Sequence, residues 1–527
     1  MAENNKKPFV LAVLDGWGVG KKMVGNPIEA AQTPVIDEIA KQYPMALLQA
    51  SGPAVGMTWG ETGNSEVGHL SIGAGRIVEQ YLAKINRSVS DGNFFKNAAL
   101  VGAFDHARQN NSKVHIVGLL TSGTVHASFH HLLSLLDMAI EKEFQETYLH
   151  LFMDGRDSGL QEGAELLTKL NDEVRGRGFG KIASVIGRTF GMDRDNNWDR
   201  TEKTFKLLAE AEGEKSPDLI ATVKAHYAKD QNDPAMPPIV TEESGFSGMS
   251  DNDAVIFFNF REDSMRQIAQ AFVEENFDKF ERFNFSNLYI CTMTQYLENS
   301  RANVAFMPPD IPNGLAETIS IRGMTQFHIA ETEKYAHVTY FFNGLRNQDY
   351  EGETDVFIES HKNHVENPEM KAIEIAEKVV EAIKSGSYDF IILNFANADL
   401  LAHSGNFAAT VKGIETIDEG IGIIKEAVLA RNGTMIITAD HGNAEEMTYR
   451  GSGQEETKHN ESPVPFYLID SRLQTEKSPQ KISQETREVA GILADVAPTV
   501  LELMQISQPQ EMTGQSLIRV MKLNLES

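Results

Sequence analysis

FVLAVLDGWG, residues 9–18, is the stretch that decides the fold, because six apolar residues run together and then stop at Asp15 and Gly16. A continuous apolar run of this length is typical of a β-strand that is buried on both faces. Longer amphipathic stretches, such as 370–384 and 410–430, lie between runs of this kind. The further runs are 114–123, 148–157, 182–195, 254–263, 390–399 and 435–443. This alternation predicts an α/β protein with largely parallel sheets and helices on both faces.

Length and composition narrow the classes of protein that fit. A chain of 527 residues is too long for one core of usual size, so we expect two domains. The net charge of −27 argues against nucleic acid or an anionic membrane as the main partner. The one cysteine, Cys291, excludes an intramolecular disulfide and fits a reducing, cytoplasmic setting. No apolar run is long enough for a membrane span or a signal peptide.

Two segments are candidates for domain joints. AFMPPDIPNG, residues 305–314, has three prolines and a glycine and is typical of a linker. A second joint is expected at 77–80, after a glycine-rich stretch. We therefore predict one domain built from residues 1–77 and 313–527, and a second domain, 80–307, inserted into it.

Polar residues at strand ends are the first candidates for chemistry, because ligands of parallel sheets bind just past the carboxyl ends of strands. Carboxylate, imidazole and hydroxyl groups are the ligand types that Mn²⁺ and Zn²⁺ prefer. Taken singly, such an aspartate is usually a turn residue and such a histidine is usually structural. As a set they predict a metal centre. Its six members are Asp15, Asp399, His403, Asp440, His441 and His459.

A second set consists of cations that follow the strand-like runs of the middle piece. Its members are His126, Arg156, Arg188, Arg194, Arg261 and Arg266, and Lys334 joins them from the C-terminal piece. Guanidinium groups bind phosphate and carboxylate through paired hydrogen bonds. Surface salt bridges are the alternative explanation in so acidic a chain, but the grouping favours a small polyanionic substrate. Asp157 lies among these cations, which favour its ionised form, and would be available as a base.

Ser65 lies in TGNSEVGHL, residues 62–70, and raises a separate question. The many glycines around it, at positions 60, 63, 68, 73 and 75, argue against an ordinary helix. The serine is then either a cap in a glycine-rich turn or a nucleophile. There is no Ser-His-Asp order and no GxSxG elbow, so a divalent cation is the activator that the chain offers.

Nine stretches, in this order along the chain, resemble a known family. They are LDGWG (14–18), TGNSEVGH (62–69), DGRD (154–157), MDRDNNWDR (192–200), FFNFRED (257–263), EKYAHVTYFFNG (333–344), NFANADLLAH (394–403), TADHGNAE (438–445) and KHNESPVPF (458–466). The chain is similar to the cofactor-independent phosphoglycerate mutases of the alkaline-phosphatase superfamily. That resemblance implies a phosphatase-like metal-binding domain, an inserted phosphotransferase domain that binds the substrate, and hinges at 77–80 and 305–314.

The resemblance also implies roles for individual residues. One Mn²⁺ would be held by Asp399, His403 and His459. A second Mn²⁺ would be held by Asp15, Ser65, Asp440 and His441. The substrate-binding positions of the family fall on His126, Arg156, Asp157, Arg188, Arg194, Arg261 and Lys334.

The reaction implied by the resemblance is the interconversion of 3-phosphoglycerate and 2-phosphoglycerate in glycolysis and gluconeogenesis. Ser65 would carry the phosphoryl group as phosphoserine, and Asp157 would move protons to and from the glycerate hydroxyls. No 2,3-bisphosphoglycerate would be needed. The family implies a cytoplasmic enzyme that is usually monomeric, with no nucleic acid or membrane partner.

The sequence departs from the family at two positions in the substrate-binding set. Ser264 stands where a second arginine is common, and Arg266 is the candidate to replace it. Ser122 stands where the family has an aspartate. The nearest alternative function is another phosphate enzyme of the superfamily, such as a phosphopentomutase or a metal-dependent phosphatase. A non-catalytic metal-binding protein is the alternative from a different class.

Overall fold

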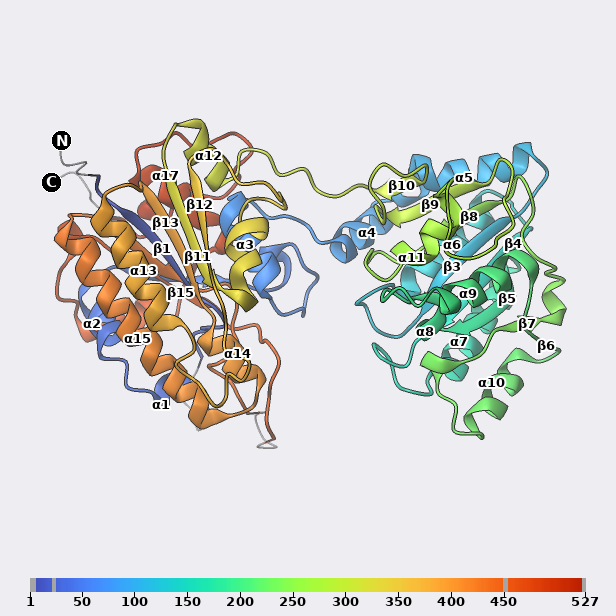
Figure 1. Ribbon diagram of the computed structural model, residues 1–527, viewed down its shortest axis with the longest axis horizontal. Coiled ribbons are helices and arrows are strands. Elements are labelled where there is room, and N and C mark those ends of the chain that lie inside the picture. The colour runs from blue at the N-terminus through green and yellow to red at the C-terminus, as the bar shows by residue number, and fades with distance from the viewer. Residues whose placement is uncertain (1–5, 21–24, 449–453, 524–527) are drawn as a thin grey trace. The chain divides into compact units, whose positions relative to one another are not determined.

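A computed structural model describes residues 6–20, 25–448 and 454–523. The chain forms two compact units, shown in Figure 1. Unit 1 consists of Met1–Glu79 and Pro309–Ser527, and unit 2 consists of Gln80–Pro308. The joints fall inside the segments 77–80 and 305–314, whose role as hinges stays a prediction.

Unit 1 is built on an eight-stranded sheet in the order β12-β11-β13-β1-β14-β15-β2-β16. Its strands are β1 Phe9–Leu14, β2 Met45–Gln49, β11 Gln326–Glu331, β12 Glu353–Ile358, β13 Phe390–Phe395, β14 Thr434–Thr438, β15 Val464–Ile469 and β16 Val489–Ile492. Neighbouring strands are parallel except at β15, which is antiparallel to both β14 and β2. β1 lies between β13 and β14, and all of its residues are buried, as the apolar run predicts.

Helices cover both faces of this sheet (Figure 1). Helices α13 and α15 pack against each other and against β13 and β1, while α3 and α12 pack together elsewhere on the unit. The helices of unit 1 are α1 Pro27–Ala30, α2 Pro34–Gln42, α3 Ser65–Ala74, α12 Leu315–Ile321, α13 Ala372–Ser385, α14 Asn397–His403, α15 Phe407–Ala430, α16 Pro479–Glu485, α17 Val496–Leu503 and α18 Leu517–Val520. The predicted helical stretches 370–384 and 410–430 correspond to α13 and α15.

Unit 2 has its own eight-stranded sheet, in the order β10-β9-β8-β3-β4-β5-β7-β6. The strands are β3 Val114–Leu120, β4 Thr147–Met153, β5 Lys181–Gly187, β6 Glu214–Ser216, β7 Ile239–Thr241, β8 Ala254–Phe257, β9 Tyr289–Thr294 and β10 Asn303–Phe306. The helices are α4 Tyr81–Ser90, α5 Ala98–Gln109, α6 Phe129–Glu141, α7 Gly163–Arg177, α8 Arg188–Gly191, α9 Trp198–Glu210, α10 Leu219–Tyr227 and α11 Arg266–Val273. The pairing is parallel except between β5 and β7.

The predicted α/β fold with largely parallel sheets is therefore confirmed. The register explains why polar residues converge, since Leu14 at the end of β1 pairs with Phe395 of β13, and Val13 pairs with Thr438 of β14. The residues that follow these three strands therefore meet at one edge of the sheet. Within residues 6–20, 25–448 and 454–523, no helix is long and apolar enough to cross a membrane.

The core of unit 2 contains a buried chain of polar side chains. His115 on β3 contacts Asp253 through Nε2 (3.1 Å) and His150 of β4 through Nδ1 (3.0 Å). His150 Nδ1 in turn lies 2.8 Å from the hydroxyl of Ser184 on β5. Burial holds the pKa of His115 below its ordinary value, against the opposing effect of Asp253, and holds the pKa of His150 well below it. Both rings are therefore neutral in the folded chain.

These two histidines predict that the protein loses stability as the pH falls. The unfolded chain takes up protons on them below about pH 6.5, whereas the folded chain does not. The free energy of unfolding should then fall as the pH drops from about 7 to 5, and His150, whose pKa is lowered further, should contribute more of the slope than His115. Urea unfolding followed by circular dichroism measures this slope. The double variant His115→Gln, His150→Gln should flatten it, and an unchanged slope would contradict the prediction.

Candidate active site

Six of the seven predicted metal-site residues of unit 1 come from loops and a short helix at the carboxyl edge of the sheet. Asp15 follows β1, Asp440 and His441 follow β14, and Asp399 lies on α14 after β13. The side chains of these four residues are at most 2% exposed. His403 ends α14, and His459 lies in the loop before β15.

Ser65, the seventh, is the first residue of α3, so the prediction that this glycine-rich stretch is no ordinary helix is wrong. Asn64 is the N-cap and accepts a hydrogen bond from the backbone N–H of Val67 (3.0 Å). Packing requires two of the glycines, because a Cβ on Gly68 would lie 2.5 Å from the carbonyl oxygen of Asp440, and one on Gly73 would lie 2.0 Å from that of Phe342. Tertiary packing thus outweighs the low helix propensity of glycine here.

The Ser65 hydroxyl lies at the centre of the group. Its Oγ donates to Asp15 Oδ1 (3.0 Å) and lies 3.1 Å from Nε2 of His441. As the first residue of a ten-residue helix, Ser65 also lies at the positive end of the helix dipole, where anionic groups such as phosphates are favoured. The position suits a hydroxyl that attacks a phosphoryl group.

Lys334, which the sequence assigns to the substrate, contacts the same group. It ends the 3₁₀ turn η5 (Thr332–Lys334) after β11. Its Nζ donates to Ser65 Oγ (2.7 Å), Asp15 Oδ1 (2.6 Å) and Asp399 Oδ2 (2.7 Å). Burial would lower the pKa of Lys334, but the neighbouring aspartates outweigh it and raise the pKa above its ordinary value, so the ammonium is charged.

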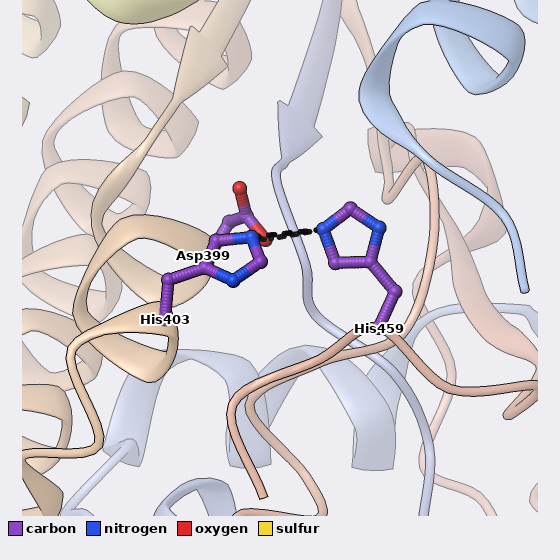
Figure 2. A group of neighbouring side chains, drawn as sticks. All are labelled: Asp399, His403 and His459. Atoms are coloured by element: carbon purple, nitrogen blue, oxygen red, sulfur yellow. Dashed lines mark hydrogen bonds and ion pairs between the residues drawn. The ribbon is translucent and has the colours of Figure 1, made fainter. Parts of the chain in front are cut away.

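Asp399, His403 and His459 point toward one another from two separate segments (Figure 2). Both imidazole Nε2 atoms lie 3.3 Å from Asp399 Oδ1 and 2.9 Å from each other. Each Nδ1 donates to a backbone carbonyl, that of Thr457 for His403 (2.7 Å) and that of Gly63 for His459 (2.9 Å). The Nε2 atoms of both rings therefore face the same point beside a carboxylate, which fits a bound cation. The hydrogen bond to Asp399 raises the pKa of His403 above its ordinary value, and a cation bound here would displace that proton.

The second predicted group also fits a cation. Nε2 of His441 lies 3.4 Å from Asp15 Oδ1 and 3.7 Å from Asp440 Oδ2. Asp440 Oδ2 is buried and accepts no hydrogen bond from any residue that the structure describes. Burial would lower the pKa of His441, but Asp440 and the other carboxylates outweigh it and raise the pKa to about 9. A divalent cation in this group would displace that proton and satisfy the carboxylates.

In unit 2, four residues gather at the ends of β3, β4 and β5. His126 Nδ1 lies 2.6 Å from Asp157 Oδ2, and Arg188 Nη1 lies 3.2 Å from Asp157 Oδ1. Arg188 also pairs with Asp154, a buried residue that the sequence analysis does not single out. Burial would raise the pKa of Asp154, but hydrogen bonds from Thr121 and Arg188 outweigh it and lower the pKa. Its position directly after β4, like that of Asp15 after β1, is the signal that could have identified it.

The remaining predicted cations of unit 2 are exposed at the surface. Arg194 and Arg261 both pair with Asp263, and the Nε of Arg261 lies 3.2 Å from Asp263 Oδ1. Arg156 is exposed. Arg266 is also exposed and lies 4.0 Å from Glu262.

At the two positions of departure from the family, Ser122 is exposed and Ser264 is buried. The hydroxyl of Ser264 has no hydrogen-bond partner within residues 6–20, 25–448 and 454–523. Arg266 lies beside Glu262, whereas Arg194 and Arg261 share Asp263.

Three buried polar residues around the unit 1 group are missing from the sequence-based set. His69 and Asn394 lie beside Asp440 and Asp15, and the amide of Asn443 donates to Asp399 Oδ1 (2.8 Å). All three are fully buried. They lie inside three of the stretches quoted above, but a sequence alone does not show that a polar side chain is buried against a carboxylate.

Comparison with known proteins gives consistent matches over the whole chain. A family profile described as Metalloenzyme superfamily matches residues 7–508. The chain is 43% identical over 520 residues to the 2,3-bisphosphoglycerate-independent phosphoglycerate mutase of Cellvibrio japonicus, which covers 97% of this chain and 99% of the relative. It is 44% identical over 522 residues to the protein of the same name from Clostridium botulinum, with 98% and 100% covered.

A solved structure agrees with these relatives. The crystal structure of Leishmania mexicana phosphoglycerate mutase at low cobalt concentration is 28% identical in sequence, with a TM-score of 0.68 and 97% of each chain covered. Such identity over nearly the full length of both relatives shows common descent and a common fold. The chain therefore belongs to the 2,3-bisphosphoglycerate-independent phosphoglycerate mutase family, within the metalloenzyme superfamily.

Proposed function

We propose that the chain interconverts 3-phosphoglycerate and 2-phosphoglycerate through a phosphoserine on Ser65, without 2,3-bisphosphoglycerate. The observation that carries this proposal is the setting of the Ser65 hydroxyl. Ser65 is the first residue of a helix, and its hydroxyl oxygen lies about 3 Å or less from atoms of Asp15, His441 and the Lys334 ammonium. These contacts supply what phosphoryl transfer needs, namely a positioned nucleophile and positive charge for the phosphoryl oxygens.

Two divalent cations, which we propose to be Mn²⁺, belong to this function. Asp399, His403 and His459 would hold one, and Asp15, Ser65, Asp440 and His441 would hold the other. When bound, such ions stabilise a serine alkoxide and neutralise phosphate charge. The support is the fit of the donor groups described above, and the membership of the chain in a metalloenzyme family.

The chain's own residues then account for the two transfers. In the first, Ser65 reacts in the ionised form that the cation site would stabilise, its Oγ bonds to phosphorus, the ester bond to glycerate breaks, and the freed glycerate oxygen takes a proton. In the second, the other glycerate hydroxyl gives up its proton, attacks phosphorus and releases Ser65. Asp157, held between His126 and Arg188, is the proposed donor and acceptor of these protons. Lys334 would hold the Ser65 oxygen and the phosphoryl group in place.

We assign substrate binding to unit 2 and phosphoryl transfer to unit 1. His126, Arg156, Arg188, Arg194 and Arg261 are the proposed ligands of the phosphate and carboxylate of the substrate. Arg266 is the candidate for the place of the arginine that is missing at Ser264, and its role is tested below. A basic group in a chain of net charge −27 supports an anionic ligand. We further propose a cytoplasmic enzyme that acts as a monomer.

An assay with 3-phosphoglycerate and Mn²⁺, without added 2,3-bisphosphoglycerate, tests the proposal. The expected product is 2-phosphoglycerate, with the phosphate retained. Release of inorganic phosphate without mutase product would favour a phosphatase. Turnover of a pentose phosphate alone would favour a phosphopentomutase. A strict requirement for 2,3-bisphosphoglycerate would contradict the proposal.

Two arginine variants test the proposed substrate ligands of unit 2. Arg261→Ala removes a charge-assisted hydrogen bond to the substrate, so we expect KM to rise about 10- to 100-fold. Arg266→Ala is the comparison, and because Arg266 is exposed and lies beside Glu262, we expect its KM to rise less than about threefold. Steady-state kinetics measure both. Equal effects would instead assign to Arg266 the role of the arginine that is missing at Ser264.

A further inference from the structure

Two fully buried residues, His69 and Asn394, lie between the carboxylates of Asp15 and Asp440, the two aspartates assigned to the same cation as Ser65. His69 lies on α3, one turn after Ser65, and its Nδ1 lies 2.9 Å from the Ser65 carbonyl oxygen and 3.2 Å from Asp440 Oδ2. Asn394 lies on β13, and its Nδ2 lies 3.1 Å from His69 Nε2 and 2.8 Å from Asp15 Oδ2. The contacts form a continuous bridge from Asp440 through His69 and Asn394 to Asp15.

The partners of this bridge allow one arrangement of protons. A carbonyl oxygen only accepts hydrogen bonds, so Nδ1 of His69 carries the proton. The amide nitrogen of Asn394 only donates, so Nε2 of His69 is the acceptor. If the amide were turned over, its oxygen would face both the Nε2 lone pair and the Asp15 carboxylate. The ring and the amide therefore hold each other in a single orientation.

The orientation of the Asn394 amide determines which oxygen of Asp15 accepts the hydrogen bond from Ser65. Asn394 occupies Oδ2 of Asp15, which leaves Oδ1 as the oxygen that accepts from Ser65 Oγ (3.0 Å) and from Lys334 Nζ (2.6 Å). On the other side, Nδ1 of the same ring lies 3.2 Å from Oδ2 of Asp440, a close polar contact without the geometry of a hydrogen bond. One pair of residues, which does not itself reach the serine hydroxyl, thus hydrogen-bonds Asp15 and contacts Asp440.

We propose that His69 and Asn394 are positioning residues that present one oxygen of Asp15, together with Asp440, to the divalent cation beside Ser65. This inference rests on the proposed function, because it concerns the cation assigned there to Asp15, Ser65, Asp440 and His441. Replacing a residue that hydrogen-bonds a metal ligand typically weakens metal binding by about 10- to 100-fold.

The bridge itself can be tested without metal. Urea unfolding is compared in a chelator for the wild type, His69→Leu, Asn394→Leu and the double variant. If the two side chains act as one unit, the double variant loses no more free energy of unfolding than the more damaging single variant. Additive losses would show that the side chains act independently and would overturn the bridge.

Titration calorimetry with Mn²⁺ alone tests whether the His69–Asn394 bridge affects the affinity for the cation. The amide oxygen of a glutamine at position 69 can take the place of Nε2 and accept from Asn394, so His69→Gln should bind both ions within about threefold of wild type. His69→Asn is too short to reach Asn394, so it should weaken one of the two sites about 10- to 100-fold and leave the His403 site unchanged.

Each other outcome of the titration overturns a stated part of the argument. If His69→Asn binds both ions as the wild type does, or if His69→Gln is as weak as His69→Asn, the positioning role is wrong. If the wild type binds no Mn²⁺, the metal assignment of the proposed function falls, and the effect on the cation falls with it. The unfolding cycle still decides in that case whether the bridge exists.

Discussion

Ser65→Ala is expected to lower mutase activity by at least about 10⁴-fold, because it removes the atom that takes the phosphoryl group in the proposed reaction. The loss should appear in kcat, since the substrate ligands of unit 2 remain. The variant should also form no phosphoenzyme, which mass spectrometry of the intact protein with 3-phosphoglycerate measures. Ser65 is buried, and removing one hydroxyl creates little empty volume, so the fold should persist.

Ser71→Ala is the matched control for this variant. Ser71 lies on the same helix and is as buried as Ser65, and its hydroxyl has no hydrogen-bond partner in the part of the chain that the structure describes. Its replacement should leave activity nearly unchanged. Substantial turnover by Ser65→Ala, or equal losses in the two variants, would rule out Ser65 as the nucleophile.

Removal of divalent metal is the second change with a large expected effect. Treatment with a chelator should lower activity by at least about 10³-fold, because several neighbouring carboxylates and the serine oxygen would lose their counter-charge. Added Mn²⁺ should restore activity, with two ions bound per chain by elemental analysis. Since the ligand histidines must be unprotonated, metal binding and activity should both weaken at mildly acid pH.

Histidine variants test which residues hold the metal ions. His403→Ala removes one of the two Nε2 atoms beside Asp399, so it should lower the bound metal by one ion per chain. His361→Ala is the control, because His361 is exposed and has no described side-chain partner. Activity that resists the chelator, or full metal content in His403→Ala, would contradict the metal assignment.

Much of the fold follows from one local pattern in the sequence. Apolar runs such as 9–14 and 390–395 are buried on both faces, and the parallel sheet that this requires brings their carboxyl ends together. The grouping of Asp15, Asp399 and Asp440 is a consequence of that register, so their positions at run ends were sufficient to predict it. The roles of these residues are a separate matter and await the experiments above.

Other parts of the site could not be predicted, because they depend on contacts between distant segments. The glycines around Ser65 argued against a helix, and only the close approach of Asp440 and Phe342 explains why the helix forms with them. The charge of Lys334 groups it with the arginines in the sequence. In the fold, however, Lys334 ends the turn that follows β11, and its ammonium contacts Asp15 and Asp399. Burial, which distinguishes His69 and Asn394 from ordinary polar residues, is likewise a property of the folded chain.

The position of β1 has a consequence for how the chain folds during synthesis. β1 ends near residue 14, yet its two neighbours in the sheet, β13 and β14, lie about 380 and 425 residues later in the chain. At a synthesis rate of about 5–20 residues per second, the strand made first waits roughly 20–85 s for its partners. Unit 2 is continuous in sequence and can fold during that interval. β2 waits at least as long, because both of its neighbours, β15 and β16, are made still later. The apolar runs of β1 and β2 are therefore exposed to aggregation for most of the synthesis of the chain.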